Sequence, residues 1–226
     1  MKRASQFFNK EDLRKIADAV EDAERRTSGE IVPAVAGVSG RYDRAEDLFG
    51  MVLALVVLTL SWLWVQEIQP VEGDWEMGQT LVLGLVPILF IVLAGFLIGA
   101  VAATRIPVLR LPFISKKEML QEVERGAAEA FHRFRVRRTA EASGILIYVS
   151  LYEHMVRVIG DDAINEKLGQ SDWDGVRDLV IDGIRSGQPA DGLVRAIRKC
   201  GELLSEHFPV RPGDVNELHN ELRIID

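Results

Sequence analysis

The chain has 226 residues, a formal net charge of −7 and 27% charged residues. This acidic balance, together with the lack of a basic stripe, argues against a nucleic-acid-binding protein. The single cysteine, Cys200, excludes an internal disulfide and suits a reducing compartment. Lys2 and Arg3 have no apolar run behind them, so we expect no cleavable signal peptide.

A helix followed by a strand is predicted at the start of the chain. Asn9 can cap a helix whose first turn carries two acids, and Gly29 lies just past its end. Residues 30–38 then form an apolar run that predicts a strand. Because Pro33 has no N–H to donate, we expect an edge strand or an irregular first part.

Two uncharged apolar runs follow, at residues 48–65 and 81–103. A bilayer core of about 30 Å needs roughly 20 apolar residues in a helix, and a soluble core helix would keep a polar stripe. Neither run has such a stripe. The sequence therefore predicts a transmembrane helical hairpin, with two buried core helices as the alternative.

Residues at the ends of the hairpin suit a membrane interface. Trp62, Trp64 and Trp75 lie near the connecting loop, where amphipathic rings favour the headgroup zone. Arg105 and Arg110 follow the second run and are expected at the opposite interface. Within that run, a G-x-x-x-G pattern predicts close helix packing; its residues are Gly95 and Gly99.

The flanking charges predict an orientation. The connector at residues 66–79 has four acids and no Lys or Arg, whereas both outer flanks carry Lys or Arg. Because Lys and Arg stay on the cytoplasmic side, we expect both termini in the cytoplasm and the acidic loop outside. The expected location is the inner (cytoplasmic) membrane, crossed twice.

Beyond the hairpin, residues 144–150 form a continuous apolar run that predicts a central strand covered on both faces. Residues 155–159 follow closely enough to form an antiparallel hairpin with it. Helical patterns precede and follow these strands, and the final residues are expected to be loosely ordered. The predicted parts are 1–47 (first part of a cytoplasmic domain), 48–103 (hairpin), 104–208 (second part of the domain) and 209–226 (polar tail).

Three segments resemble the TPM domain family: Thr27-Ser28-Gly29-Glu30-Ile31-Val32, Gly144-Ile145-Leu146-Ile147-Tyr148-Val149 and Arg157-Val158-Ile159-Gly160-Asp161. The resemblance covers roughly residues 10–38 and 115–208. It implies an α/β fold, an α/β/α sandwich around a small mixed sheet, here discontinuous in sequence with the hairpin inserted. Family members include accessory proteins of photosystem repair and of a receptor, and some are reported as acid phosphatases or as binding divalent metal.

This chain departs from the family pattern in two places. Members usually have an acidic D-N-G before the second strand, where this chain has Glu141-Ala142-Ser143-Gly144. Many members also carry the domain outside the cytoplasm with a membrane helix at one end, whereas here the apolar pair is internal. Both departures weaken the transfer of a catalytic role.

The candidate metal site is a group of carboxylates at Glu141, Asp161 and Asp162. Ca²⁺ and Mg²⁺ take several carboxylate or carbonyl oxygens, and open α/β sheets place ligands at strand ends. The alternative is that Asp161 or Asp162 simply caps a short helix. The four histidines show no metal-ligand spacing, and no catalytic residue set can be assembled.

The sequence favours a non-catalytic accessory or docking module held at the membrane. Its partners would be the lipid bilayer and another membrane protein or a second copy of the chain, with no nucleic acid. The alternative is a divalent-metal-dependent enzyme similar to acid phosphatases, which would use the acidic cluster at the strand ends and Ca²⁺ or Mg²⁺.

Overall fold

The computed structural model describes residues 4–66, 83–139, 142–210 and 216–226. The chain forms two compact units, one from residues 1–40 together with 117–226, and one from residues 41–116. The second unit contains α2 (Asp43–Gln66), α3 (Leu85–Arg105) and the short helix η2 (Pro107–Phe113). The first unit is an α/β domain built from both ends of the chain.

A four-stranded mixed sheet lies at the centre of this domain, in the order β3-β2-β1-β4. The strands are β1 (Glu30–Ala36), β2 (Gly144–Ser150), β3 (Met155–Gly160) and β4 (Arg223–Ile225). β1 pairs in parallel with both β2 and β4, and β2 pairs antiparallel with β3. The predicted antiparallel hairpin and the central position of residues 144–150 are therefore confirmed.

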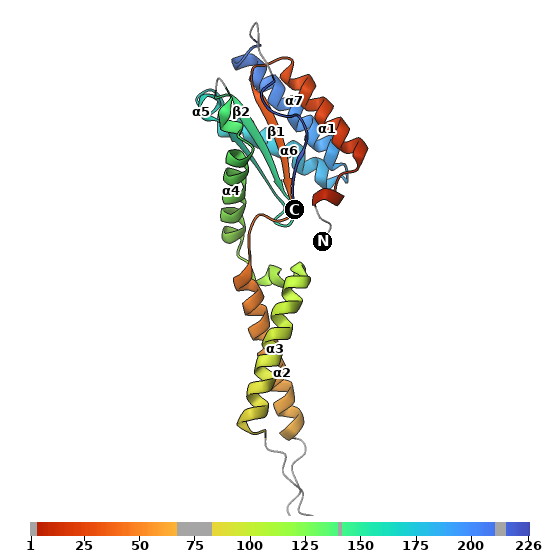
Figure 1. Cartoon of the computed structure of the whole chain (residues 1–226), viewed down its shortest axis with the longest axis vertical. Coiled ribbons are helices and arrows are strands. Elements are labelled where there is room, and N and C mark those ends of the chain that lie inside the picture. Colours follow the sequence, from red (N-terminus) through yellow and green to blue (C-terminus); the bar gives the residue numbers. More distant parts are fainter. Residues whose placement is uncertain (1–3, 67–82, 140–141, 211–215) are drawn as a thin grey trace, which may run out of the picture. The chain divides into compact units, whose positions relative to one another are not determined.

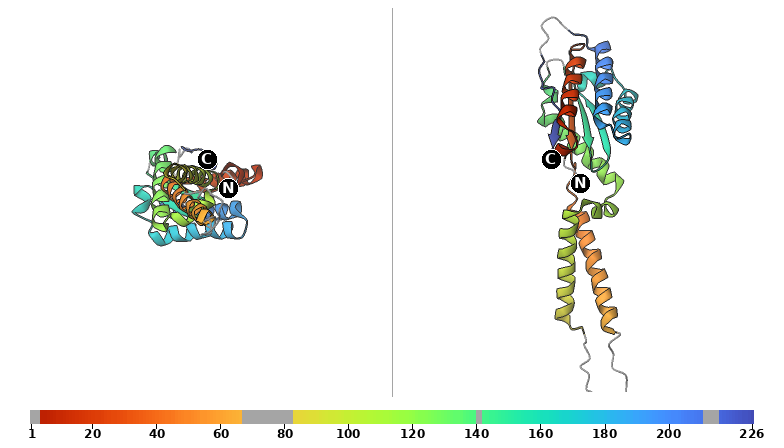
Figure 2. Two further views of the ribbon diagram at one scale, coloured as in Figure 1. Left: turned by 90° about the horizontal axis from the view of Figure 1, so that it is seen from below. Right: turned by 90° about the vertical axis from the view of Figure 1, so that its right-hand side faces the viewer.

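Helices cover both faces of the sheet (Figures 1 and 2). α1 (Lys10–Glu24), α6 (Gln170–Arg185) and α7 (Pro189–His207) cover one face, and α4 (Lys116–Arg133) covers the other. Alternate β2 residues enter the two cores: Ile145 and Ile147 join the first, and Leu146 and Tyr148 join the second. This confirms the predicted α/β/α sandwich. The remaining short helices are η1 (Ala4–Gln6), η3 (Val136–Arg138) and α5 (Asp162–Asn165).

Pro33 lies in an internal strand, so the expectation of an edge strand is wrong. The N–H of Glu30 donates to Ser143 O on the β2 side, whereas the N–H of Ile31 donates to Glu24 on the other side. Because N–H direction alternates along a strand, Pro33 lacks its donor on the side of β4. β4 pairs only with Ala34, Val35 and Ala36, so no ladder hydrogen bond is lost.

The C-terminal residues were expected to be loosely ordered, and this is wrong for β4. Its pairing with β1 continues into a hydrogen bond from the N–H of Gly37 to Ile225 O, at 2.9 Å. Leu222, just before β4, is buried in the core under α1 and α7. The sheet is thus completed by the end of the chain.

Candidate functional site

The predicted carboxylate cluster lies where β3 ends and α5 begins. Asp161 is the N-cap of α5, and its Oδ1 accepts the N–H of Asp162 at 2.8 Å. Asp162 forms an ion pair with Arg137, with Nη2 and Oδ2 2.7 Å apart. The helix-capping alternative is therefore realised at Asp161.

The metal hypothesis for this cluster stays a prediction, because Glu141 lies outside the described residues. Within the described part of the chain, no group of three or more His, Cys, Asp or Glu residues could hold a metal ion. The side chain of Asp161 is only 2% exposed. Its Oδ2 atom is buried and has no hydrogen-bond partner among the residues whose positions are described.

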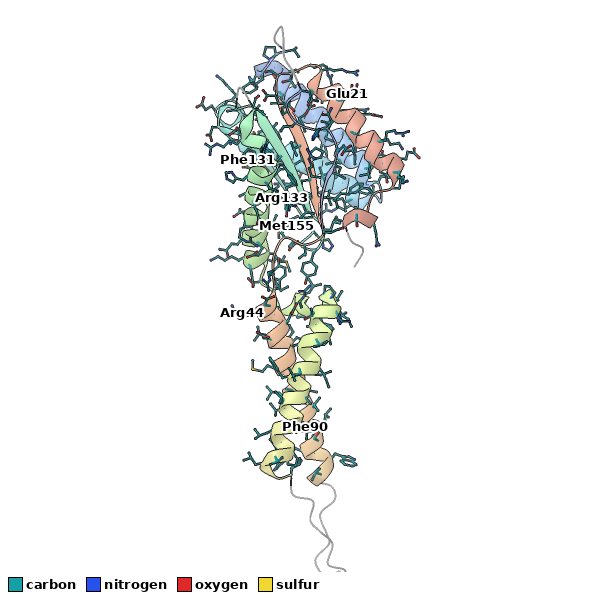
Figure 3. The ribbon with its side chains drawn as sticks, in the orientation of Figure 1. Glu21, Arg44, Phe90, Phe131, Arg133 and Met155 are labelled. Atoms are coloured by element: carbon teal, nitrogen blue, oxygen red, sulfur yellow. The ribbon has the colours of Figure 1, made fainter. Side chains whose placement is uncertain are left out.

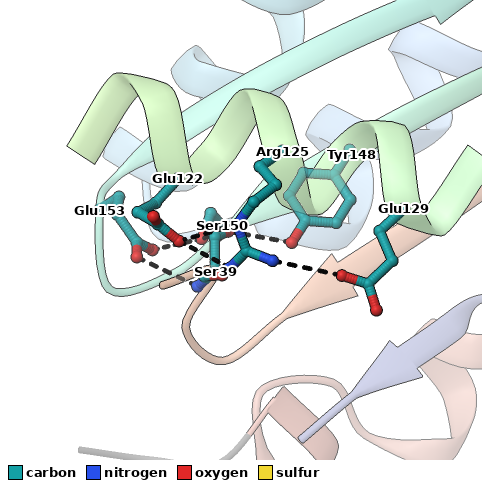
Figure 4. Close-up of polar contacts among 7 residues, drawn as sticks. All are labelled: Ser39, Glu122, Arg125, Glu129, Tyr148, Ser150 and Glu153. Atoms are coloured by element: carbon teal, nitrogen blue, oxygen red, sulfur yellow. Dashed lines mark hydrogen bonds and ion pairs between the residues drawn. The ribbon is translucent and has the colours of Figure 1, made fainter. Parts of the chain in front are cut away.

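A second polar cluster lies at the carboxyl ends of β1 and β2, centred on Ser39 (Figure 4). The Ser39 hydroxyl is hydrogen-bonded to the hydroxyls of Tyr148, at 2.9 Å, and Ser150, at 2.6 Å. Ser150 also donates to the carboxylate of Glu153, which accepts the N–H of Ser39 at 3.0 Å. We call these four residues the Ser39 network.

α4 closes over the Ser39 network from the other side. Arg125 donates to Ser39 O at 3.4 Å and pairs with Glu122 at 2.6 Å and Glu129 at 3.5 Å (Figure 4). A Cβ on Gly126 would lie 2.8 Å from the Tyr148 hydroxyl, so glycine permits this close approach. Burial raises the pKa of Tyr148 above its usual range.

The Ser39 network joins the two segments of the domain that flank the inserted helices. Ser39 follows β1 and precedes α2, while α4 follows α3 and η2. A Cβ on Gly40 would come within 2.6 Å of Glu122 Cγ, so these two segments touch each other directly. Because Ser150, Tyr148 and Glu153 are buried, we interpret the network as a structural link between the two segments.

A pair of glutamates lies at the opposite, amino end of β1. Glu24 accepts the N–H of Ile31 at 2.9 Å. Glu30 is 6% exposed and accepts the N–H groups of Glu217 at 3.0 Å and Leu218 at 3.2 Å. Burial raises the pKa of Glu24 to about 8, the charge of Glu30 adds to the increase, and the hydrogen bond from Ile31 opposes it.

In the second unit, apolar side chains point outward from both long helices. In each helix only 11% of the most apolar stretch is buried. Phe90 projects freely from α3 at 71% exposed (Figure 3). Near the end of α2, Trp62 is 47% and Trp64 70% exposed, and Trp75 lies outside the described residues.

The predicted interface arginines differ in their surroundings. Arg110, in η2, forms an ion pair with Glu46 of α2, with Nη1 and Oε1 2.7 Å apart. That glutamate also accepts the Thr104 hydroxyl at 2.7 Å. Arg105 is the last residue of α3 and is exposed.

Gly95 and Gly99 lie in the contact between α2 and α3. A Cβ on Gly95 would approach Ala54 Cα to 2.9 Å, and one on Gly99 would approach Gly50 Cα to 2.7 Å. The sequence reasoning named only the two glycines of α3. The signal for their partners was present, because Gly50 and Ala54 also form a small-x-x-x-small pair within the first apolar run.

Residues 114–203 match the family model of the TPM domain. This part of the chain carries a TPM domain. The matched range contains α4, β2, β3 and α6, and β1 lies before it while pairing with β2 along its full length. The TPM fold of this chain is therefore completed by residues on the far side of the inserted hairpin.

One solved structure similar to this chain is the NMR structure of the BA42 protein from the psychrophilic bacterium Bizionia argentinensis. The match has a TM-score of 0.58 and 21% sequence identity, and it covers 99% of each chain. At this identity the likeness shows the fold alone. No curated protein matches the chain.

Sequence reasoning missed the Ser39 network and the Glu24–Glu30 pair. Both depend on contacts between residues far apart in sequence, such as Ser39 with Ser150 and Glu30 with Glu217. Only the position of Ser39 just past a predicted strand could have suggested that it lies at a sheet edge.

Proposed function

We propose that this protein is a membrane-anchored TPM domain that acts as an accessory or docking module for a membrane protein complex. The hairpin would cross the bilayer twice, with the TPM domain in the cytoplasm and the acidic loop outside. The observation that carries the proposal is the insertion itself: α2 and α3 interrupt the chain between β1 and α4.

The exposure of the hairpin supports insertion into lipid. A core helix of a soluble protein is mostly buried, whereas α2 and α3 pack closely on each other through small residues and leave most of their large apolar side chains exposed. Twenty-one residues in α3 span about 30 Å at the helical rise, which matches a bilayer core. The absence of Lys and Arg from residues 66–79 supports the external loop.

Cysteine labelling tests this topology in a bacterial expression host. In a Cys200→Ser chain, Gly73→Cys should react with a membrane-impermeant maleimide added to intact cells, whereas Ser205→Cys should react only after the cells are opened. Ser205 is the matched control because it lies on α7 of the TPM domain. Labelling of Ser205→Cys in intact cells would place the domain outside and overturn the orientation.

The docking role is tested by the size of the complex after gentle extraction. Extraction into polymer-bounded lipid discs should yield an assembly larger than the 25.2 kDa chain, containing a membrane partner or further copies. Removing residues 41–116 and joining the domain by a short linker would abolish the assembly if the membrane anchor is needed. Recovery of a lone chain under several mild conditions would contradict the role.

A phosphatase function is the second candidate, favoured by the buried and unpartnered Oδ2 atom of Asp161 described above. A divalent cation bound at Asp161 would supply that partner. This function predicts release of p-nitrophenol from its phosphate ester with Mg²⁺ or Ca²⁺, lost in Asp161→Asn with the fold retained. Equal turnover in the variant and the unchanged chain would remove Asp161 from the site.

A further inference from the structure

A large apolar pocket lies in the α/β domain; its lining includes Ser150 of the Ser39 network and none of the predicted carboxylates that the structure describes, Asp161 and Asp162. Its volume is about 540 Å³, within the range of roughly 300–1,000 Å³ that small-molecule sites occupy. The apolar lining comes from the residue that follows η1, from the β2–β3 hairpin and from α6. These residues are Phe7, Leu151, Met155, Val156, Ile181 and Ile184.

Three polar residues complete the lining: Ser150, His154 and Arg185. The Ser150 hydroxyl is occupied by Ser39 and Glu153, so it belongs to the Ser39 network. Arg185 is exposed at the end of α6, and it makes no ion pair or side-chain hydrogen bond with the residues that the structure describes. No Asp or Glu lines the pocket among these same residues. The pocket is therefore apolar inside, with one cation free at its edge.

The pocket lies at the edge of the sheet where β2 ends and β3 begins. Ser150 ends β2, and Leu151 donates its N–H to Ala36 O at the end of β1. The carboxyl ends of parallel strands are where open α/β sheets commonly bind ligands. Met155, labelled in Figure 3, begins the returning strand β3 at this same edge.

We propose that this pocket binds a single-chain amphiphile with an anionic head, such as a fatty acid, with the alkyl chain among the apolar side chains and the acid on Arg185. The apolar lining suits the chain, because burying it removes hydrocarbon from water. The guanidinium suits a carboxylate, with which it forms charge-assisted hydrogen bonds. This inference does not depend on the docking role or on catalysis.

Methionine methyl NMR tests the proposal on the full chain in phosphatidylcholine nanodiscs. Titration with laurate should shift the methyl signal of Met155 saturably and leave that of Met119, on α4 and outside the pocket lining, unchanged. The Met155 signal is assigned by its loss in Met155→Leu. An unmoved Met155 signal at saturating laurate overturns the proposal.

Two variants separate the chain-binding and the acid-binding parts of the site. Arg185→Gln should weaken laurate binding about tenfold, as expected for one charge-assisted hydrogen bond, and leave dodecan-1-ol binding unchanged. The matched control, Arg195→Gln, removes an exposed arginine from α7 and should change neither. Ile184→Trp should abolish binding of both ligands by filling the pocket, with circular dichroism confirming the fold.

The remaining outcomes also decide the question. Equal weakening of laurate and dodecan-1-ol by Arg185→Gln overturns the anionic head. A Met155 shift on changing the nanodisc lipid to phosphatidylglycerol, with no response to laurate, overturns the single-chain ligand in favour of a membrane phospholipid.

Discussion

Glu24 holds a proton in the folded domain at a pH where a free glutamate is ionised. Its pKa is about 8 against an ordinary value of 4.5, because burial disfavours the charged carboxylate and Glu30 lies nearby. Glu30 is held by the N–H groups of residues 217 and 218, which suit a carboxylate. Glu24 is thus the side chain that keeps a proton, whereas Glu30 accepts two backbone hydrogen bonds.

This difference makes the stability of the domain depend on pH. Between pH 4.5 and about 8 the folded chain retains a proton at Glu24 that the unfolded chain has lost, so the free energy of unfolding falls as pH rises across that window. Glu24→Gln keeps an acceptor for Ile31 without the ionisation. It should stabilise the domain by roughly 1–2 kcal/mol at about pH 8 and by far less at about pH 5.

Urea unfolding curves at the two pH values measure this effect. Asp18→Asn, which removes an exposed carboxyl group from the same helix, is the matched control and should leave the pH dependence unchanged. A gain for Glu24→Gln that is equal at both pH values would contradict a raised pKa at Glu24.

At the same scale, the sequence allowed prediction of only the local interactions. Asp161 caps α5 through a hydrogen bond to the next residue, and a contact between adjacent residues can be predicted from the sequence. At the start of α6, the side chain of Asp172 accepts the N–H of Gly169, three residues before it, which is likewise a local contact. The contact of Glu30 with the C-terminal residues joins positions almost 190 apart, which periodicity does not reveal.

At the scale of elements, α2 and α3 are held together by small residues facing each other. An ideal Cβ on Gly95 would lie 3.4 Å from the Cβ of Ala54. Disulfides need Cβ atoms about 3.5–4.5 Å apart. In a Cys200→Ser chain, Ala54→Cys with Gly95→Cys should therefore form a disulfide within one chain on mild oxidation, visible as a change in gel mobility that reductant reverses.

Leu97 provides the control for this experiment. It lies on α3 and is 53% exposed, so Ala54→Cys with Leu97→Cys should stay reduced within the chain. Cross-linked pairs of chains from Gly95→Cys alone would show instead that the G-x-x-x-G surface serves self-association, contrary to the packing of α3 on α2.

The existence of the long elements was predictable, and their neighbours were not. Continuous apolar runs identified α2, α3 and β2 because burial or lipid exposure leaves little room for polar residues. The position of Pro33 in an internal strand could not be predicted, because it depends on how far β4 extends. β4 has only three residues and no sequence pattern that separates it from a polar tail.

At the scale of the whole molecule, the α/β domain is assembled from two segments of the chain, residues 1–40 and 117–226. β1 lies before the hairpin, β2 and β3 lie after it, and β4 comes from the last residues. The family match ends at residue 203, so the last strand lies beyond the matched range. The C-terminal residues therefore supply both a strand of the sheet and the two N–H groups that donate to Glu30.

A chain that stops after Val210 tests this dependence. It loses the β4 pairing, the buried Leu222 and the two N–H donors to Glu30. We expect the free energy of unfolding to fall by roughly 3 kcal/mol or more, since removing a buried leucine side chain costs about 2–5 kcal/mol and a buried acceptor without donors costs about 1–3 kcal/mol.

Hydrogen exchange of the detergent-solubilised chain provides a local measurement. Amides of Val35 and Gly37 should exchange faster, whereas those of β2 that face β3 serve as the internal control, because their partner strand is retained. Ile224→Ala, at a half-exposed position of β4, should have a much smaller effect than Leu222→Ala. Unchanged exchange at Gly37 in the shortened chain would show that β4 contributes nothing to the sheet.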